Sequence, residues 1–171
     1  VLLLSNPNNP TGQLLPPATL LGWHARLAAR GGLLVVDEAF IDATPEASVL
    51  AAASEPGLIV LRSLGKFWGL AGLRCGFVAA ENALLDALAE RLGPWTVSGP
   101  ARWVAQRALA DRAWRSNTAP QLHAASARLA ALLDSHGLPS PSGCALFRWV
   151  PTPLAHTLFI AFAQRAVLLR E

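Results

Sequence analysis

The 171-residue sequence has one lysine, no methionine and no tyrosine. Its other cationic side chains are all arginine, a bias typical of genes rich in G and C. Arginine and lysine serve equally as surface charges, but only lysine loses its proton near neutral pH and attacks a carbonyl. Lys66, within Ser63-Leu64-Gly65-Lys66-Phe67-Trp68-Gly69, is therefore a candidate Schiff-base nucleophile. Its isolation alone leaves a solvated surface cation as the alternative.

Charge, cysteine and long apolar runs are also scarce. Charged residues make up 15% and hydrophobic residues 53%, which is typical of a globular core. A net charge of +3 without a basic, aromatic-rich segment argues against a nucleic-acid partner. The two cysteines and four histidines have no metal-ligand spacing, so no metal site is expected. Every apolar run is shorter than the ~18 residues that span a bilayer, and we predict a cytoplasmic protein with reduced thiols.

Both ends of the sequence are apolar. The first four residues resemble a strand already under way, and 166–169 form another apolar segment. Domains seldom begin and end inside core elements, so we expect a fragment of a longer protein.

Four short apolar runs, at 1–5, 33–36, 59–61 and 75–80, predict strands. Strands of this kind, alternating with helices, are typical of an α/β fold whose sheet is covered on both faces. Ligands of such sheets bind beyond the carboxyl ends of the strands, where Asn9, Asp37 and Ser63 stand. The sequence therefore predicts one shared site.

Helical spacing predicts the remaining elements. The first helix opens at Pro16-Pro17 and ends at Gly31-Gly32. Further segments complete the pattern: helices over 82–92, 101–114, 121–136 and 154–165, a turn at 137–143 and a strand at 145–150. A change to smaller helix–strand units near 110–120 divides the chain into 1–113 and 114–171.

Four motifs together resemble the fold-type I pyridoxal-phosphate enzymes, in the class I and II aminotransferase group. They are Asn9-Pro10-Thr11-Gly12, Asp37-Glu38-Ala39-Phe40, Ser63-x-x-Lys66 and Arg74. Gly69-x-x-Gly72 superficially suggests a dinucleotide site, but it follows the lysine instead of opening a βαβ unit. The resemblance implies a three-layer, aspartate-aminotransferase-like α/β large domain, of which 1–113 is the C-terminal half. Residues 114–171 would be part of a small α+β C-terminal domain.

The resemblance also implies a role for each site residue. Lys66 would hold pyridoxal 5'-phosphate and then move protons as a general acid and base. Asp37 would keep the ring nitrogen protonated, since a nearby opposite charge favours the ionised form. Asn9 would donate to the phenolic oxygen, and Ser63 and Arg74 would bind the phosphate. The alternatives are turn or capping roles for Asp37 and Asn9 and a surface cation for Arg74.

The chain departs from the family pattern at Phe40, where many members carry a tyrosine that also bonds the phenolic oxygen. Phe40 cannot donate, so Asn9 would bear that interaction alone. The family's ring-stacking aromatic residue, its glycine-containing phosphate cup and its substrate-carboxylate arginine lie outside this chain. None of the three candidates Arg148, Arg165 and Arg170 stands in the arginine motif, so none is assigned that role.

Longer segments, including Leu61-Arg62-Ser63-Leu64-Gly65-Lys66-Phe67 and Gly93-Pro94-Trp95-Thr96-Val97-Ser98-Gly99-Pro100-Ala101, look like the threonine-phosphate decarboxylases of cobalamin biosynthesis. That resemblance implies loss of CO2 from L-threonine O-3-phosphate, giving (R)-1-amino-2-propanol O-2-phosphate, in a homodimer with sites at the subunit interface. Two alternatives stay open: a transaminase like the related histidinol-phosphate aminotransferases, and a non-catalytic fragment unable to hold cofactor alone.

Overall fold

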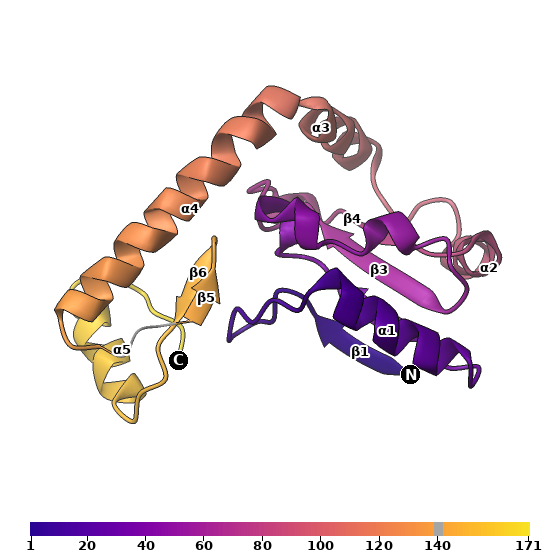
Figure 1. The fold of residues 1–171 in the computed structure, drawn as a ribbon. Helices are drawn as coiled ribbons and strands as arrows, with labels where there is room; N and C mark the ends of the chain where they lie inside the picture. Colours follow the sequence, from indigo (N-terminus) through magenta and orange to yellow (C-terminus); the bar gives the residue numbers. More distant parts are fainter. Residues whose placement is uncertain (139–141) are drawn as a thin grey trace.

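The computed structural model describes residues 1–138 and 142–171. A four-stranded sheet has the order β1-β2-β3-β4, with β1 at Leu2–Ser5, β2 at Leu34–Asp37, β3 at Leu58–Ser63 and β4 at Gly76–Ala79 (Figure 1). The first three strands are parallel, and β4 runs antiparallel to β3. All four predicted strands are confirmed.

One face of this sheet carries the main core. Alternate residues of β2 and β3 are buried, with Leu34, Val36 and Val60 at 0% exposure. They pack with Leu20 of α1 (Pro17–Ala28), and burying each such side chain contributes about 1.5–3 kcal/mol. On β1, Leu3 stays 67% exposed. Within this chain the sheet is therefore less evenly covered than the sequence predicts.

The segment between β2 and β3 is built from short 3-10 turns: η1 (Ile41–Ala43), η2 (Pro45–Ala47) and η3 (Leu50–Ala52). A fourth, η4 (Ala71–Leu73), precedes β4. The sequence pattern did not predict these turns, because runs of three residues carry no helical period.

Three helices follow β4: α2 (Asn82–Leu92), α3 (Gly99–Ala110) and α4 (Arg112–Ser135). The prediction for α2 is confirmed. The predicted boundary between helices at 101–114 and 121–136 is wrong, because Pro120 lies inside α4 and the break falls at Asp111. The Asp111 carboxylate accepts a hydrogen bond from Trp114 N at 2.8 Å and so caps α4.

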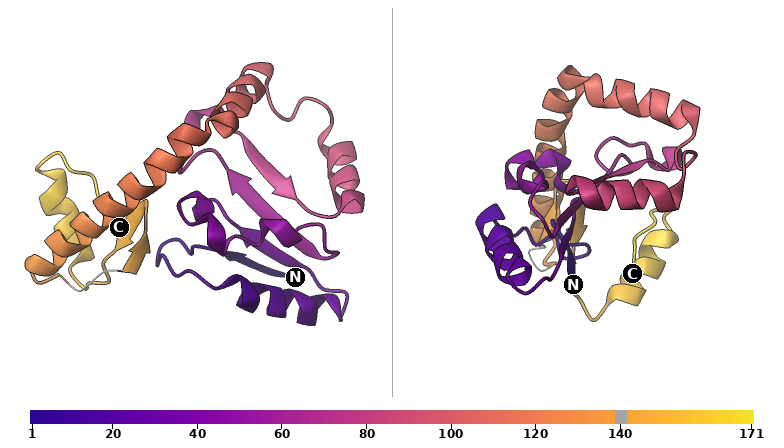
Figure 2. Two further views of the ribbon diagram at one scale, coloured as in Figure 1. Left: turned by 45° about the horizontal axis from the view of Figure 1, so that its top comes forward. Right: turned by 90° about the vertical axis from the view of Figure 1, so that its right-hand side faces the viewer.

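The C-terminal part holds a two-stranded antiparallel sheet, β5 (Ser142–Cys144) and β6 (Phe147–Trp149), followed by α5 (Ala155–Ala163). The predicted strand at 145–150 is confirmed as β6. The predicted turn at 137–143 lies partly outside the described residues, and its end at Ser142 belongs to β5. Helix α4 joins this unit to the rest of the chain (Figure 2).

The β5–β6 hairpin touches the loop that follows β1. Ser142 Oγ donates a hydrogen bond to Thr11 O at 2.6 Å. A Cβ added to Gly12 would overlap the backbone of Gly143, and Gly12 has φ +73°. Both facts require glycine at position 12.

Candidate active site

The parallel register brings three strand ends to one edge of the sheet. Ser5 pairs with Asp37, and Asp37 with Leu61. Asn6 N donates to Asp37 O and Glu38 N to Leu61 O, each at 2.9 Å, so the ladder continues past β1 and β2. Asp37 therefore ends β2 beside the loop that carries Asn9, and Ser63 ends the adjacent strand β3. The prediction that polar residues gather at the carboxyl ends is confirmed for these strands.

Lys66 lies on a tight turn directly after β3. Ser63 Oγ accepts a hydrogen bond from Gly65 N at 3.0 Å, and Gly69 N donates to Lys66 O at 3.0 Å. The next residues, Phe67 and Trp68, are 3% and 7% exposed and anchor the turn in a second core cluster. Lys66 itself is exposed. The turn thus presents an amine on a fixed backbone.

The ring of Phe40 lies beside this amine. Lys66 Nζ is 5.3 Å from the centroid of the Phe40 ring, within the range of a cation–π interaction. Phe40 follows Asp37 by one turn, so the contact also places Lys66 near the end of β2. The contact between Phe40 and Lys66 therefore brings the motif that begins at Asp37 beside the motif that ends at Lys66.

Arg74 lies where the chain turns into β4. It adopts φ +51° and ψ +43°, the left-handed region that non-glycine residues rarely occupy. Leu64 N donates to Cys75 O at 3.3 Å, which holds Arg74 close to the turn of Lys66. Its guanidinium donates a hydrogen bond to Ala71 O at 3.3 Å, and the side chain is exposed.

Asn9 is exposed at the tip of its loop. The loop is closed by Gly12 N, which donates to Asn8 O at 2.7 Å, and by Asn8 Nδ2, which donates to Thr11 Oγ1 at 2.7 Å. Asn6 is fully buried and exchanges two hydrogen bonds with the backbone of Leu15. The loop is therefore fixed by hydrogen bonds of the residues around Asn9.

Asp37 uses one carboxylate oxygen to accept a hydrogen bond from Ala39 N at 3.0 Å. Among residues 1–138 and 142–171, no hydrogen bond joins two of the five candidates Asn9, Asp37, Ser63, Lys66 and Arg74. The structure gathers them at one edge of the sheet without linking them to each other.

The side chains of Glu38, Asp42 and Arg62 form a charged cluster near the carboxyl ends of β2 and β3. Glu38 is 0% exposed and accepts hydrogen bonds from Ser48 Oγ at 2.5 Å and Val49 N at 2.7 Å. Arg62 Nη1 lies 3.4 Å from Glu38, and its Nη2 pairs closely with Asp42. Arg62 thus binds two buried carboxylates. Because successive strand residues point to opposite faces, the cluster lies on the face opposite Asp37 and Ser63.

A cavity of about 420 Å³ lies between the loop after β1, Phe40, α4 and the hairpin. Its polar lining includes His123, Ser126 and Arg148. His123 Nε2 lies 2.8 Å from Ala43 O, and Ser126 Oγ donates to Cys144 O at 2.9 Å. These bonds hold α4 to both η1 and the hairpin.

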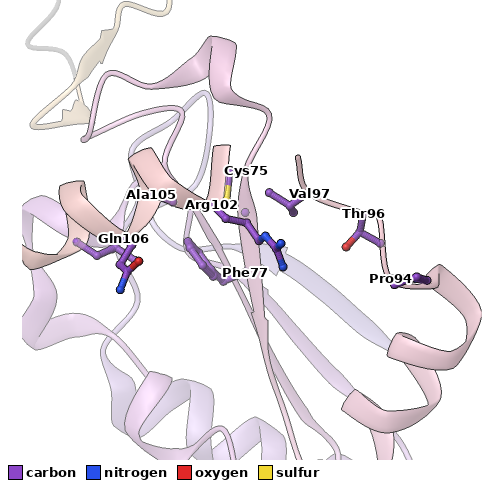
Figure 3. A pocket seen from close by; sticks show the side chains of 10 residues that line it. Cys75, Phe77, Pro94, Thr96, Val97, Arg102, Ala105 and Gln106 are labelled. Carbon is purple, nitrogen blue, oxygen red and sulfur yellow. The ribbon is translucent and has the colours of Figure 1, made fainter. Parts of the chain in front are cut away.

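A second cavity, of about 430 Å³, lies between β4 and α3 and is shown in Figure 3. Phe77 and Val97 give it apolar walls, and the side chain of Arg102 extends across it. Cys75, the residue that follows Arg74, also lines this cavity. None of the five candidate residues lines either cavity.

Cys144 lines the first cavity, and burial raises the pKa of its thiol. We expect alkylation of Cys144 in a Cys75→Ser variant to have a pH midpoint above that of the same chain in urea. Burial disfavours the thiolate, so this thiol stabilises the fold at lower pH and that contribution is lost as pH rises through the folded pKa. Iodoacetamide rates followed by mass spectrometry measure both midpoints; equal midpoints would contradict the expectation.

Residues 1–138 and 142–171 contain no cluster of three metal-ligating side chains. No helix in those ranges is long and apolar enough to cross a membrane.

The family model for aminotransferase class I and II matches residues 1–170. The chain belongs to this family. It is 56% identical, over all 171 residues, to a threonine-phosphate decarboxylase of Pseudomonas aeruginosa, of which it covers 52%. It is 41% identical over 116 residues to a histidinol-phosphate aminotransferase of Sodalis glossinidius, covering 67% of this chain and 32% of that one.

A solved structure supports the fold. The histidinol-phosphate aminotransferase of Sinorhizobium meliloti, in complex with pyridoxal-5'-phosphate, matches with a TM-score of 0.85 at 22% identity. The match covers 98% of this chain and 48% of that protein. The fold-type I assignment is thus confirmed. The chain spans about half the length of the curated relatives it matches.

Two residues near the site, Arg62 and Phe147, were not among the candidates predicted from the sequence. Arg62 continues the buried alternation of β3 after Leu58 and Val60, and a charge at such a position signals a buried partner. Phe147, which contacts Phe40 with ring centroids 5.2 Å apart, carries no such signal, because the contact joins distant parts of the sequence.

Proposed function

We propose that this protein is a pyridoxal-phosphate-dependent lyase that decarboxylates L-threonine O-3-phosphate to (R)-1-amino-2-propanol O-2-phosphate, in cobalamin biosynthesis. The observation that carries the proposal is the 56% identity over all 171 residues to a threonine-phosphate decarboxylase. Identity to a histidinol-phosphate aminotransferase is lower, 41%, and extends over only 116 residues.

The residues at the edge of the sheet fit this cofactor by their chemistry. An amine, a carboxylate, an amide, a hydroxyl and a guanidinium are the groups that its aldehyde, ring nitrogen, phenolic oxygen and phosphate require. The proposal assigns these roles to Lys66, Asp37, Asn9, Ser63 and Arg74 respectively, the last two sharing the phosphate. When bound, the cofactor supplies an electron sink for the pair released from the substrate's Cα.

The residues of this chain would have separate roles in the reaction. Lys66 Nζ holds the cofactor and afterwards carries a proton to the substrate's Cα. Asp37, fixed by its hydrogen bond from Ala39 N, maintains a positive charge at the ring nitrogen. Asn9 would donate a hydrogen bond from its side-chain amide to the phenolic oxygen of the cofactor. Phe40 has no hydroxyl and contributes packing beside Lys66.

The proposal extends to the assembled enzyme. Its substrate is a phosphorylated amino acid, and its working form is a homodimer in the cytoplasm. Residues 1–113 belong to the large domain and 114–171 to the small domain. The four-stranded sheet precedes α4 in the sequence and the two-stranded sheet follows it, which supports this division.

The alternative is transamination of the histidinol-phosphate type, which the 41% identity favours. The test supplies L-threonine O-3-phosphate with pyridoxal phosphate and measures CO2 release with and without 2-oxoglutarate. CO2 release independent of the keto acid is expected. Amino transfer that needs 2-oxoglutarate and releases no CO2 would sink the decarboxylase proposal.

A further inference from the structure

Phe147 packs against the ring of Phe40. The two rings meet edge to face, with centroids 5.2 Å apart and an interplanar angle of 81°, a geometry that aromatic quadrupoles favour. Phe40 in turn lies 5.3 Å from Lys66 Nζ. The three side chains form a series that runs from β6 to the amine.

Phe40 needs such a partner. It precedes η1 with φ −110° and ψ +4°, outside any regular element, and its ring is only partly buried. A phenylalanine has no hydroxyl through which a hydrogen bond could fix its ring. Packing must therefore set the ring's orientation.

Phe147 comes from a hairpin that is fixed independently. Ser142 donates to Thr11 O at 2.6 Å, and Ser126 Oγ donates to Cys144 O at 2.9 Å. Arg148, the residue after Phe147, donates from Nε to Ser126 O at 3.2 Å. The hairpin is thus held by the loop on one side and by α4 on the other.

We propose that Phe147 is a positioning residue: through the ring of Phe40 it sets where Lys66 presents its amine. The proposal rests on the proposed role of Lys66 for its catalytic meaning, but the positioning itself is a property of the chain alone. Through these contacts, the position of the β5–β6 hairpin determines the position of the Lys66 amine at the edge of the sheet.

The test uses NMR of protein labelled with carbon-13 at the lysine Cε, with Lys66→Arg assigning the Lys66 signal. Phe40→Leu is expected to move this signal downfield, because the ring current is lost. Phe147→Leu should produce more than half of that displacement. Phe147→Tyr, which keeps a ring, should leave the signal at its wild-type position.

The matched control is Phe159→Leu, the same change on α5, which should not move the Lys66 signal. The proposal is overturned if Phe147→Leu leaves the signal in place while Phe40→Leu moves it. It is also overturned if Phe159→Leu moves the signal as far as Phe147→Leu, because the effect would then be a general loss of packing.

A second measurement addresses the cofactor. Phe147→Leu should slow capture of pyridoxal phosphate on Lys66, trapped by borohydride, by about 2- to 13-fold, the factor that matches the strength of one aromatic pair. Unchanged capture would contradict the positioning role. If the wild-type chain captures no cofactor, that result favours a non-catalytic fragment, while the NMR result still decides the position of Lys66.

Discussion

Replacing Lys66 with arginine is expected to abolish covalent capture of pyridoxal phosphate. Arginine keeps the positive charge but stays protonated and cannot attack an aldehyde. Decarboxylation should fall by at least ~10²–10⁴-fold, the usual contribution of positioned proton transfer alone. The measurement is borohydride reduction with the cofactor, followed by peptide mass spectrometry, together with CO2 release.

The composition of the chain makes an adduct on Lys66 easy to assign. Lys66 is the single lysine of the 171 residues, so no other lysine side chain among them competes for the cofactor. Arg128→Lys, on the exposed surface of α4, is the matched control, since it adds a lysine away from the site. An adduct on that lysine equal to the adduct on Lys66 would show non-specific chemistry. No adduct on Lys66 in the wild-type chain would favour a non-catalytic fragment.

Replacing Arg62 with methionine is expected to destabilise the fold by about 3 kcal/mol, near the lower end for breaking a buried ion pair. The change leaves the carboxylates of Glu38 and Asp42, at 0% and 8% exposure, without their cation. The lower end applies because the Arg62 side chain is 20% exposed. For a chain of this size the melting temperature should fall by roughly 6–12 °C, as thermal unfolding followed by circular dichroism would show.

Two variants separate charge from packing. Arg128→Met removes an exposed arginine and should leave the melting temperature nearly unchanged. A triple variant, Arg62→Met with Glu38→Gln and Asp42→Asn, removes all three charges and should recover part of the lost stability. If the triple variant were less stable than Arg62→Met alone, the unpaired charges would not be the cause.

Local chemistry predicted much of the fold and the placement of the candidate residues. Apolar runs that end in polar residues predicted β1, β2 and β3, and the parallel register then brings Asp37 beside the loop of Asn9. Helix α2 was predicted at its observed limits, because Gly93-Pro94 ends it. The roles of Asn9, Asp37, Ser63, Lys66 and Arg74 stay predictions.

The sequence failed where a distant or unusual contact decides the structure. The sequence predicted separate helices at 101–114 and 121–136, but α4 continues through Pro120 and packs against η1 and β6. Strand β5 is only three residues long and was assigned to a turn. The contact of Phe147 with Phe40 depends on how the hairpin packs, which neither local sequence encodes.

The bond between Ser142 and Thr11 spans 131 residues of sequence. During synthesis at 5–20 residues per second, the two residues are made about 7–26 s apart. For that interval the loop carrying Asn9 exists without the hairpin that later braces it, and Phe40 is likewise made before Phe147. Nascent chains arrested before residue 142 should therefore show this loop open to proteases, and chains arrested well after it should not. The edge of the sheet that presents Lys66 is thus made before the hairpin that braces it.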